Sequence, residues 1–149
     1  MIVRKATTAD LESLVDFQLL MARETEKIVL NKSTVNKGVL AVLNDETKGS
    51  YYVTEIDSKV VGSLLTTFEW SDWRNGTVLW IQSVYVLPKY RRKGIYRSMY
   101  SFLKEKVLND ENLKGIRLYA DKSNYPAQKT YESLGMSPDH YVTFEWLKD

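Results

Sequence analysis

The chain begins with a short apolar pair. After it, apolar residues recur every three or four positions in two stretches of the first third of the chain. Ile2 and Val3 predict a short strand near the start. The helical spacing predicts a first helix over about Ala9–Arg23 and a second over Ser33–Leu43. The segment between them, Glu24–Lys32, has no clear period and is expected to be irregular.

The middle of the chain is rich in β-branched and aromatic residues, which favour strands. Strands are expected over Tyr51–Ile56 and Lys59–Phe68, with Asp57-Ser58 forming the tight turn between them. Asn75-Gly76 is typical of a second hairpin turn, and a strand over Thr77–Val86 follows it. These three strands are predicted to form an antiparallel meander.

The last third of the chain again alternates between helical and strand patterns. We expect a helix over Ile95–Val107 and a strand over Ile116–Ala120. A further helix is predicted to begin near Pro126, and the tail, Tyr141–Trp146, has the composition of a strand. No linker or internal repeat interrupts the sequence, which therefore predicts one α/β domain with a mixed sheet.

Composition narrows the classes of function. The 149 residues carry 21 Lys and Arg against 19 Asp and Glu, a net charge of +2, so any nucleic-acid or anion site must be local. The chain has no cysteine and one histidine, which excludes disulfides, a thiolate nucleophile and a Cys/His zinc site. No stretch approaches the ~20 apolar residues of a membrane span and the start lacks a signal-like apolar run, so a soluble cytoplasmic protein is expected.

The basic loop between the strand ending at Val86 and the following helix carries the most chemical information. A helix start offers free backbone N–H groups and the positive end of the helix dipole, which together suit a phosphate or diphosphate. A side chain at Gly94 would hold a bulky anion away from those amides. Two other interpretations are a solvated basic turn and an RNA-binding or nuclear-localisation segment over Lys89–Lys93. The basic side chains around the helix start are Arg91, Arg92, Lys93 and Arg97.

Two motifs in this part of the chain match one known family in order and spacing. The first reads Val84-Tyr85-Val86-Leu87-Pro88 and then Arg91-Arg92-Lys93-Gly94-Ile95-Tyr96, and the second places Asn124, Ala127, Tyr131 and Gly135 at intervals of three, four and four residues. These blocks resemble the GNAT superfamily of acetyl-CoA-dependent N-acetyltransferases. Tyr96 departs from the family pattern, which has Gly or Ala at that position. The resemblance covers nearly the whole chain and implies a single GNAT-like domain over residues 1–149, with a mixed, mostly antiparallel central sheet and about four flanking helices.

The resemblance implies acetyl-CoA as co-substrate and no metal. In the family, the strand that matches Ser83–Val86 splays from its neighbour and its backbone holds the pantetheine arm, while the amides of the following loop bind the diphosphate. The other interpretation of Val84 and Val86 is ordinary strand core. The cofactor-binding residues implied in this way are Val84, Tyr85, Val86, Arg91, Arg92, Lys93, Gly94, Ile95, Tyr96, Arg97, Asn124 and Ala127.

The implied reaction is direct attack of an amine on the acetyl thioester without a covalent enzyme intermediate. Tyr131 matches the tyrosine that protonates the departing thiolate in the family, the other interpretation being a core tyrosine on a helix face. Relatives often have a carboxylate base where this chain has Gln82, so Glu69, Asp72 or a water chain at Gln82 would take that role. A backbone N–H near Tyr85 is expected to hold the oxyanion.

A primary amine of a small molecule is the expected acceptor. Regions that border the acceptor site in the family here carry Glu24, Glu26, Trp70 and Trp73, which would attract a cationic amine. The alternatives are a catalytically silent acyl-CoA-binding module and a protein-lysine or N-terminal acetyltransferase. The resemblance also leaves a homodimer as an alternative to a monomer, since family members often pair through strands or their C-terminal region. No nucleic-acid or membrane partner is expected.

Overall fold

The structure, a computed structural model, describes residues 1–148. They divide after Arg117 into two compact units, the second beginning at Leu118. The described part of the second unit contains one helix, α4 (Tyr125–Ser133), and no strand. The first unit contains β1 (Ile2–Lys5), the 3₁₀ turn η1 (Thr8–Asp10), α1 (Leu11–Glu26), α2 (Lys32–Asn44), β2 (Ser50–Ile56), β3 (Lys59–Ser71), β4 (Gly76–Val86), the 3₁₀ turn η2 (Pro88–Tyr90), α3 (Ile95–Asn109) and β5 (Leu113–Arg117).

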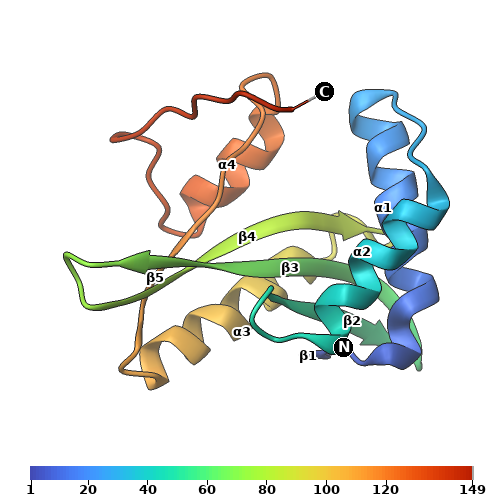
Figure 1. Cartoon of the computed structure of the whole chain (residues 1–149), viewed down its shortest axis with the longest axis horizontal. Helices are drawn as coiled ribbons and strands as arrows, with labels where there is room; N and C mark the ends of the chain where they lie inside the picture. Colours follow the sequence, from blue (N-terminus) through green and yellow to red (C-terminus); the bar gives the residue numbers. More distant parts are fainter. Residues whose placement is uncertain (149) are drawn as a thin grey trace. The chain divides into compact units, whose positions relative to one another are not determined.

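The five strands form one sheet in the order β1-β2-β3-β4-β5, so each strand lies beside its neighbour in the sequence (Figure 1). The first four are antiparallel to one another, and β5 runs parallel to β4. The α3 helix makes the crossover that a parallel pair requires. The predicted meander and mixed sheet are therefore confirmed.

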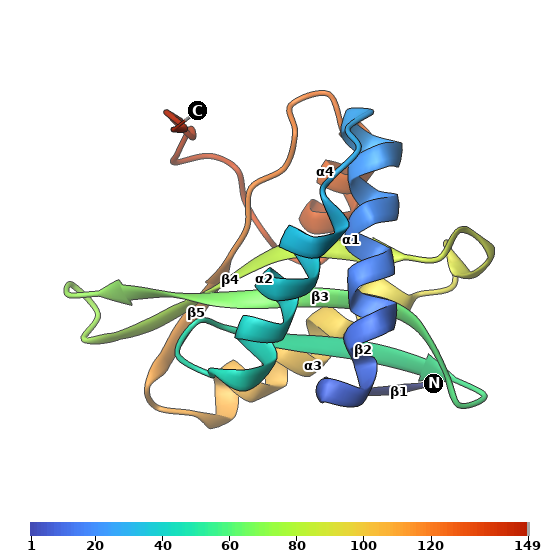
Figure 2. The same ribbon diagram turned by 45° about the vertical axis from the view of Figure 1, so that its right-hand side comes forward.

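Helices cover both faces of this sheet, with α1 and α2 on one face and α3 on the other (Figure 2). Alternation along β2 produces the two faces, because successive side chains of a strand point in opposite directions. Tyr51 and Val53 belong to a buried cluster with Leu14 of α1. Between them, Tyr52 packs its ring 5.6 Å from that of Phe102 in α3.

Two strand predictions at the C-terminal end differ from the structure. The last strand runs over Leu113–Arg117 rather than Ile116–Ala120, because its parallel ladder with β4 begins at the pair Thr77 and Leu113. The tail, Tyr141–Trp146, forms no strand. Strand composition alone does not produce a strand when no neighbouring strand pairs with the backbone.

Two element boundaries also differ, and both affect residues expected near the acceptor. Glu24 and Glu26 belong to the last turn of α1 rather than to an irregular segment. Glu69 and Trp70 lie within β3, which extends to Ser71 rather than ending at Phe68. Within residues 1–148, no helix combines the length and apolar character needed to cross a membrane.

Candidate active site

A β-bulge interrupts β4 close to its end. Ser63 of β3 faces Tyr85, and Leu65 faces Gln82. Ser83 and Val84 therefore share the space opposite a single residue of β3, which is the arrangement that defines a bulge. Ser83 adopts φ 55°, a left-handed backbone conformation that residues other than glycine rarely take. The bulge increases the local twist and changes the direction in which the last residues of β4 point.

The same end of β4 lacks a neighbouring strand on its second edge within residues 1–117. Pairing with β5 stops at Trp80 and Arg117, whereas β4 continues to Val86. An unpaired strand edge presents backbone N–H and C=O groups that can bond an extended ligand. Val84 and Val86, both half-buried, lie on this segment.

The loop after β4 leads to an open helix start at α3. Gly94 is the N-cap with φ 77°, and the first intrahelical bond runs from the Ser98 N–H to the Gly94 C=O at 2.9 Å. The amides of Arg92, Lys93 and Gly94 make no backbone hydrogen bond among the residues that the structure describes. A Cβ added to Gly94 would meet no atom within 4 Å. Exposed N–H groups at a positive helix end, with space in front of them, suit a diphosphate.

Among the basic side chains of this loop, Arg91 is held against the protein. Its Nε donates to the backbone C=O of Val86 at 2.8 Å, and its Nη2 lies 2.7 Å from Glu24 Oε2. The guanidinium also lies 5.4 Å from the ring centre of Tyr85. Arg92 and Lys93 are also exposed, and the Lys93 ammonium lies 5.5 Å from the ring centre of Tyr90.

The side chain of Tyr85 connects this loop to α1. Tyr85 is 3% exposed, its ring lies 5.2 Å from that of Phe17, and its hydroxyl donates to Glu24 Oε1 at 2.9 Å. Burial raises the pKa of the Tyr85 hydroxyl, and the bond to Glu24 raises that pKa further. The Arg91 guanidinium lowers the pKa of the Glu24 carboxyl, and the Tyr85 hydroxyl lowers it further. Sequence reasoning missed this cluster, although Phe17 and Glu24 stand seven residues apart, two turns along one helix face.

The residues expected to supply a base are already hydrogen-bonded or ion-paired. Gln82 accepts a bond from the Thr67 hydroxyl at 3.3 Å, and Glu69 forms an ion pair with Arg117. Glu69 and Trp70 are consecutive residues of β3 and so point to opposite faces of the sheet. The structure therefore does not place a carboxylate of β3 and the adjacent indole on the same face.

The second unit carries the other motif residues on α4. Asn124 caps the helix, its Oδ1 accepting from the Ala127 N–H at 3.3 Å. Burial raises the pKa of the Tyr131 hydroxyl, so this group stays protonated at neutral pH. A protonated hydroxyl is the form that can act as a general acid.

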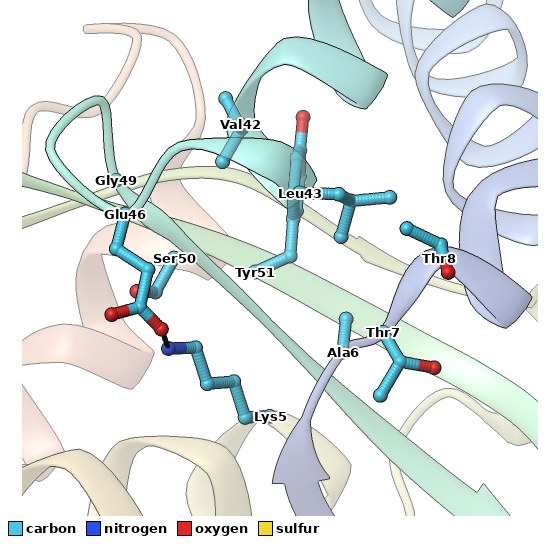
Figure 3. Close-up of a pocket in the computed structure, with 10 residues that line it drawn as sticks. All are labelled: Lys5, Ala6, Thr7, Thr8, Val42, Leu43, Glu46, Gly49, Ser50 and Tyr51. Atoms are coloured by element: carbon cyan, nitrogen blue, oxygen red, sulfur yellow. Dashed lines mark hydrogen bonds and ion pairs between the residues drawn. The ribbon is translucent and has the colours of Figure 1, made fainter.

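A cavity of about 310 Å³ lies elsewhere in the first unit, between the segment that joins β1 to η1, the end of α2 and the start of β2 (Figure 3). The Lys5 ammonium and the Glu46 carboxylate form an ion pair beside it. None of the residues singled out from the sequence lines this cavity. Within residues 1–148, no group of three or more His, Asp or Glu side chains could hold a metal ion.

Comparison with known proteins identifies relatives of this chain. The sequence model of the acetyltransferase (GNAT) family matches residues 17–136. An N-alpha-acetyltransferase of Saccharolobus solfataricus is 35% identical over 94 residues, which cover 57% of this chain and 54% of that protein, so the match spans about half the relative's length.

Solved structures show the same fold. The crystal structure of a possible acetyltransferase from Clostridium difficile 630 is 44% identical, with a TM-score of 0.92 over 99% of this chain and 97% of that one. AAC(6′)-Iy in complex with the bisubstrate analogue CoA-S-monomethyl-acetylneamine is 14% identical, with a TM-score of 0.77 over 99% of this chain and 98% of that one. At 14% identity, the similarity to AAC(6′)-Iy supports the fold alone. Together with the first structure, it confirms the predicted fold class.

Proposed function

Since the chain belongs to the acetyltransferase (GNAT) family, we propose that it binds acetyl-CoA along β4 and α3 and transfers the acetyl group to a primary amine of a small molecule. The observation that carries this proposal is the open start of α3, which follows β4 after the loop that contains η2. Beyond Trp80, one edge of β4 has no partner strand within residues 1–117. An extended pantetheine arm and a diphosphate need these two features in this order.

Each part of the cofactor has a counterpart in the residues present. Backbone groups on the outer edge of β4, at Val84 and Val86, are proposed to bond the amides of the arm, as an added strand would. The Val86 C=O also accepts the bond from Arg91 Nε. The amides of Arg92–Arg97 receive the diphosphate, with the exposed basic side chains adding charge. Gly94 keeps the space before them clear, since no protein atom lies within 4 Å of its added Cβ. Asn124 and Ala127 are proposed to contact the cofactor further along.

The chemistry assigns one task to each of three groups. Tyr131 Oη is proposed to give its proton to the departing thiolate, since a tyrosine hydroxyl is protonated at neutral pH and can act as a general acid. A backbone N–H near Tyr85 stabilises the oxyanion. Gln82, as an amide, cannot accept a proton at neutral pH and is proposed to orient the amine or a water molecule that carries its proton away.

The acceptor site is proposed to lie beside the end of α1, near Glu26. Glu24 and Glu69 are each paired with an arginine, so the structure lends less support to a strongly cationic acceptor than the sequence did. Trp70 and Trp73 are 65% and 90% exposed and offer aromatic surface to an acceptor. A second candidate is the α-amine of a protein N-terminus, favoured by the similarity to an N-alpha-acetyltransferase.

A free-thiol release assay tests the proposal and separates the candidates. Purified protein is incubated with acetyl-CoA and either a library of small amines or peptides with free N-termini. Thiol release that depends on a small amine supports the main proposal, and release with peptides alone supports the second candidate. Binding of acetyl-CoA without turnover across both sets would indicate a silent acyl-CoA-binding module and contradict both.

A further inference from the structure

We infer that Glu24 is a positioning residue for acetyl-CoA binding, because it holds Arg91 and Tyr85 so that the loop before α3 keeps its anion-binding form. This inference rests on the proposed function. It gives Glu24 a role different from the acceptor contact expected from the sequence, and it connects the last turn of α1 to the loop on which the cofactor depends.

The geometry of Glu24 shows both carboxylate oxygens in use. Oε1 accepts from the Tyr85 hydroxyl at 2.9 Å, and Oε2 lies 2.7 Å from the Arg91 guanidinium. These partners stand 61 and 67 positions away in the sequence. Both oxygens of Glu24 therefore already have protein partners, and its contribution is to hold these two side chains in place.

The loop requires such support because its own backbone bonds are few. Arg91 makes two hydrogen bonds to backbone carbonyls of this region. Its backbone N–H donates to the Pro88 C=O at 3.2 Å, and its Nε donates to the Val86 C=O. The next residue, Arg92, has φ 62°, a conformation that costs a non-glycine residue free energy. Arg91 is therefore the last fixed point before the amides that would face the diphosphate, and Glu24 fixes its guanidinium.

Electrostatics alone and the positioning role of Glu24 predict opposite changes in acetyl-CoA affinity when the charge of Glu24 is removed, so a binding measurement can separate them. Removing a negative charge near a polyanion should strengthen binding of that polyanion. Loss of a positioning contact should instead weaken binding, because the loop must then be ordered by the ligand itself. The sign of the change in acetyl-CoA affinity separates the two.

The experiment is calorimetry of acetyl-CoA binding, without acceptor, to wild type and to Glu24→Gln. We expect the variant to bind about 3- to 10-fold more weakly, the range for one exposed ion pair and one hydrogen bond. Glu12→Gln is the matched control, since Glu12 is exposed on the same helix and the charge change is identical. It should leave the affinity unchanged. Equal or tighter binding by Glu24→Gln would overturn the inference, whereas a wild type that fails to bind acetyl-CoA would instead overturn the proposed function.

Two further measurements distinguish positioning from a general loss of structure. In turnover assays, Glu24→Gln should raise the KM for acetyl-CoA while leaving kcat at saturation within about twofold. In an Arg91→Gln background, Glu24→Gln should cause a smaller loss of affinity than it does in the wild type, because only its contact with Tyr85 then remains to be lost. Additive losses in the double variant, or a fall in kcat without a change in KM, would contradict the inference.

Discussion

The Nε of Arg91 donates a hydrogen bond of 2.8 Å to the backbone C=O of Val86, the last residue of β4. This bond turns the arginine back onto the strand, away from the start of α3. Under the proposed function, recognition of a diphosphate in the loop is therefore left chiefly to backbone amides. Access to those amides depends on the residue at the helix N-cap, Gly94.

Replacing Gly94 with Trp should therefore weaken acetyl-CoA binding at least tenfold. The side chain would project from the N-cap of α3, where an added Cβ meets no neighbouring atom within 4 Å, and is expected to obstruct a diphosphate at the adjacent amides. Gly135→Trp is a matched control, because Gly135 also has a positive φ, 90°, and no atom within 4 Å of an added Cβ. Both variants carry similar backbone strain, so calorimetry showing equal affinities for the two would refute the placement of the diphosphate.

Tyr131→Phe should lower kcat by about 10²- to 10⁴-fold, the usual contribution of a general acid, with little change in acetyl-CoA affinity. The substitution retains the ring and removes only the hydroxyl group, which carries the transferable proton. Tyr125→Phe, at an exposed tyrosine of the same helix, serves as control and should keep wild-type kcat. Unchanged turnover by Tyr131→Phe, measured where chemistry limits the rate, would remove this residue from the mechanism.

Substitutions of Ser83 should show that the β4 bulge depends on a left-handed backbone conformation. Ser83→Gly accepts φ 55° without strain and should keep the free energy of unfolding within about 1 kcal/mol of wild type. Ser83→Val should lower it by more than about 1 kcal/mol, because a β-branched residue strongly disfavours that conformation. Urea unfolding measures both. A valine variant as stable as the glycine variant would show that the bulge relaxes to another conformation.

Asp10→Asn should lower the free energy of unfolding at pH 7 by about 1.5–3 kcal/mol, the range for hydrogen bonds to a charged group. Asp10 is 6% exposed and accepts two bonds of 2.8 Å from Arg4 and one of 2.8 Å from the Thr7 N–H. Asp16→Asn, at an exposed position of α1, is the control and should change stability little.

The effect of Asp10 should also depend on pH with a definite sign. The Arg4 guanidinium, more than any other group, lowers the pKa of the Asp10 carboxyl from its ordinary 3.8. A carboxyl whose pKa is lower in the folded state contributes stability that is complete above about pH 4 and lost as pH falls further. Urea unfolding of wild type and Asp10→Asn should therefore converge below pH 4. A constant difference from pH 7 to pH 2 would contradict this account.

Much of the fold could be predicted because its signals are local. The turn at Asp57-Ser58 forms where expected, and both residues adopt positive φ. The second hairpin also forms, but its connection runs over residues 72–75, and Gly76 begins β4 opposite Ser71. The motif residues Gly94 and Asn124 lie at the N-caps of α3 and α4, as a helix-start interpretation requires. The strand at the end of the first unit was placed three residues too late, because its register depends on pairing with β4 and not on its own composition.

The sequence by itself determined the order and type of the elements, since the period of apolar positions sets which face of a helix or strand can be buried. It also determined the family, through residues at fixed spacing on those elements. Only the tertiary structure decided which charges remain available. Glu24 and Glu69 look equally exposed in the sequence, yet each meets an arginine, 67 and 48 positions away. Such pairs depend on how distant elements pack, and neither periodicity nor composition within a short stretch contains that information.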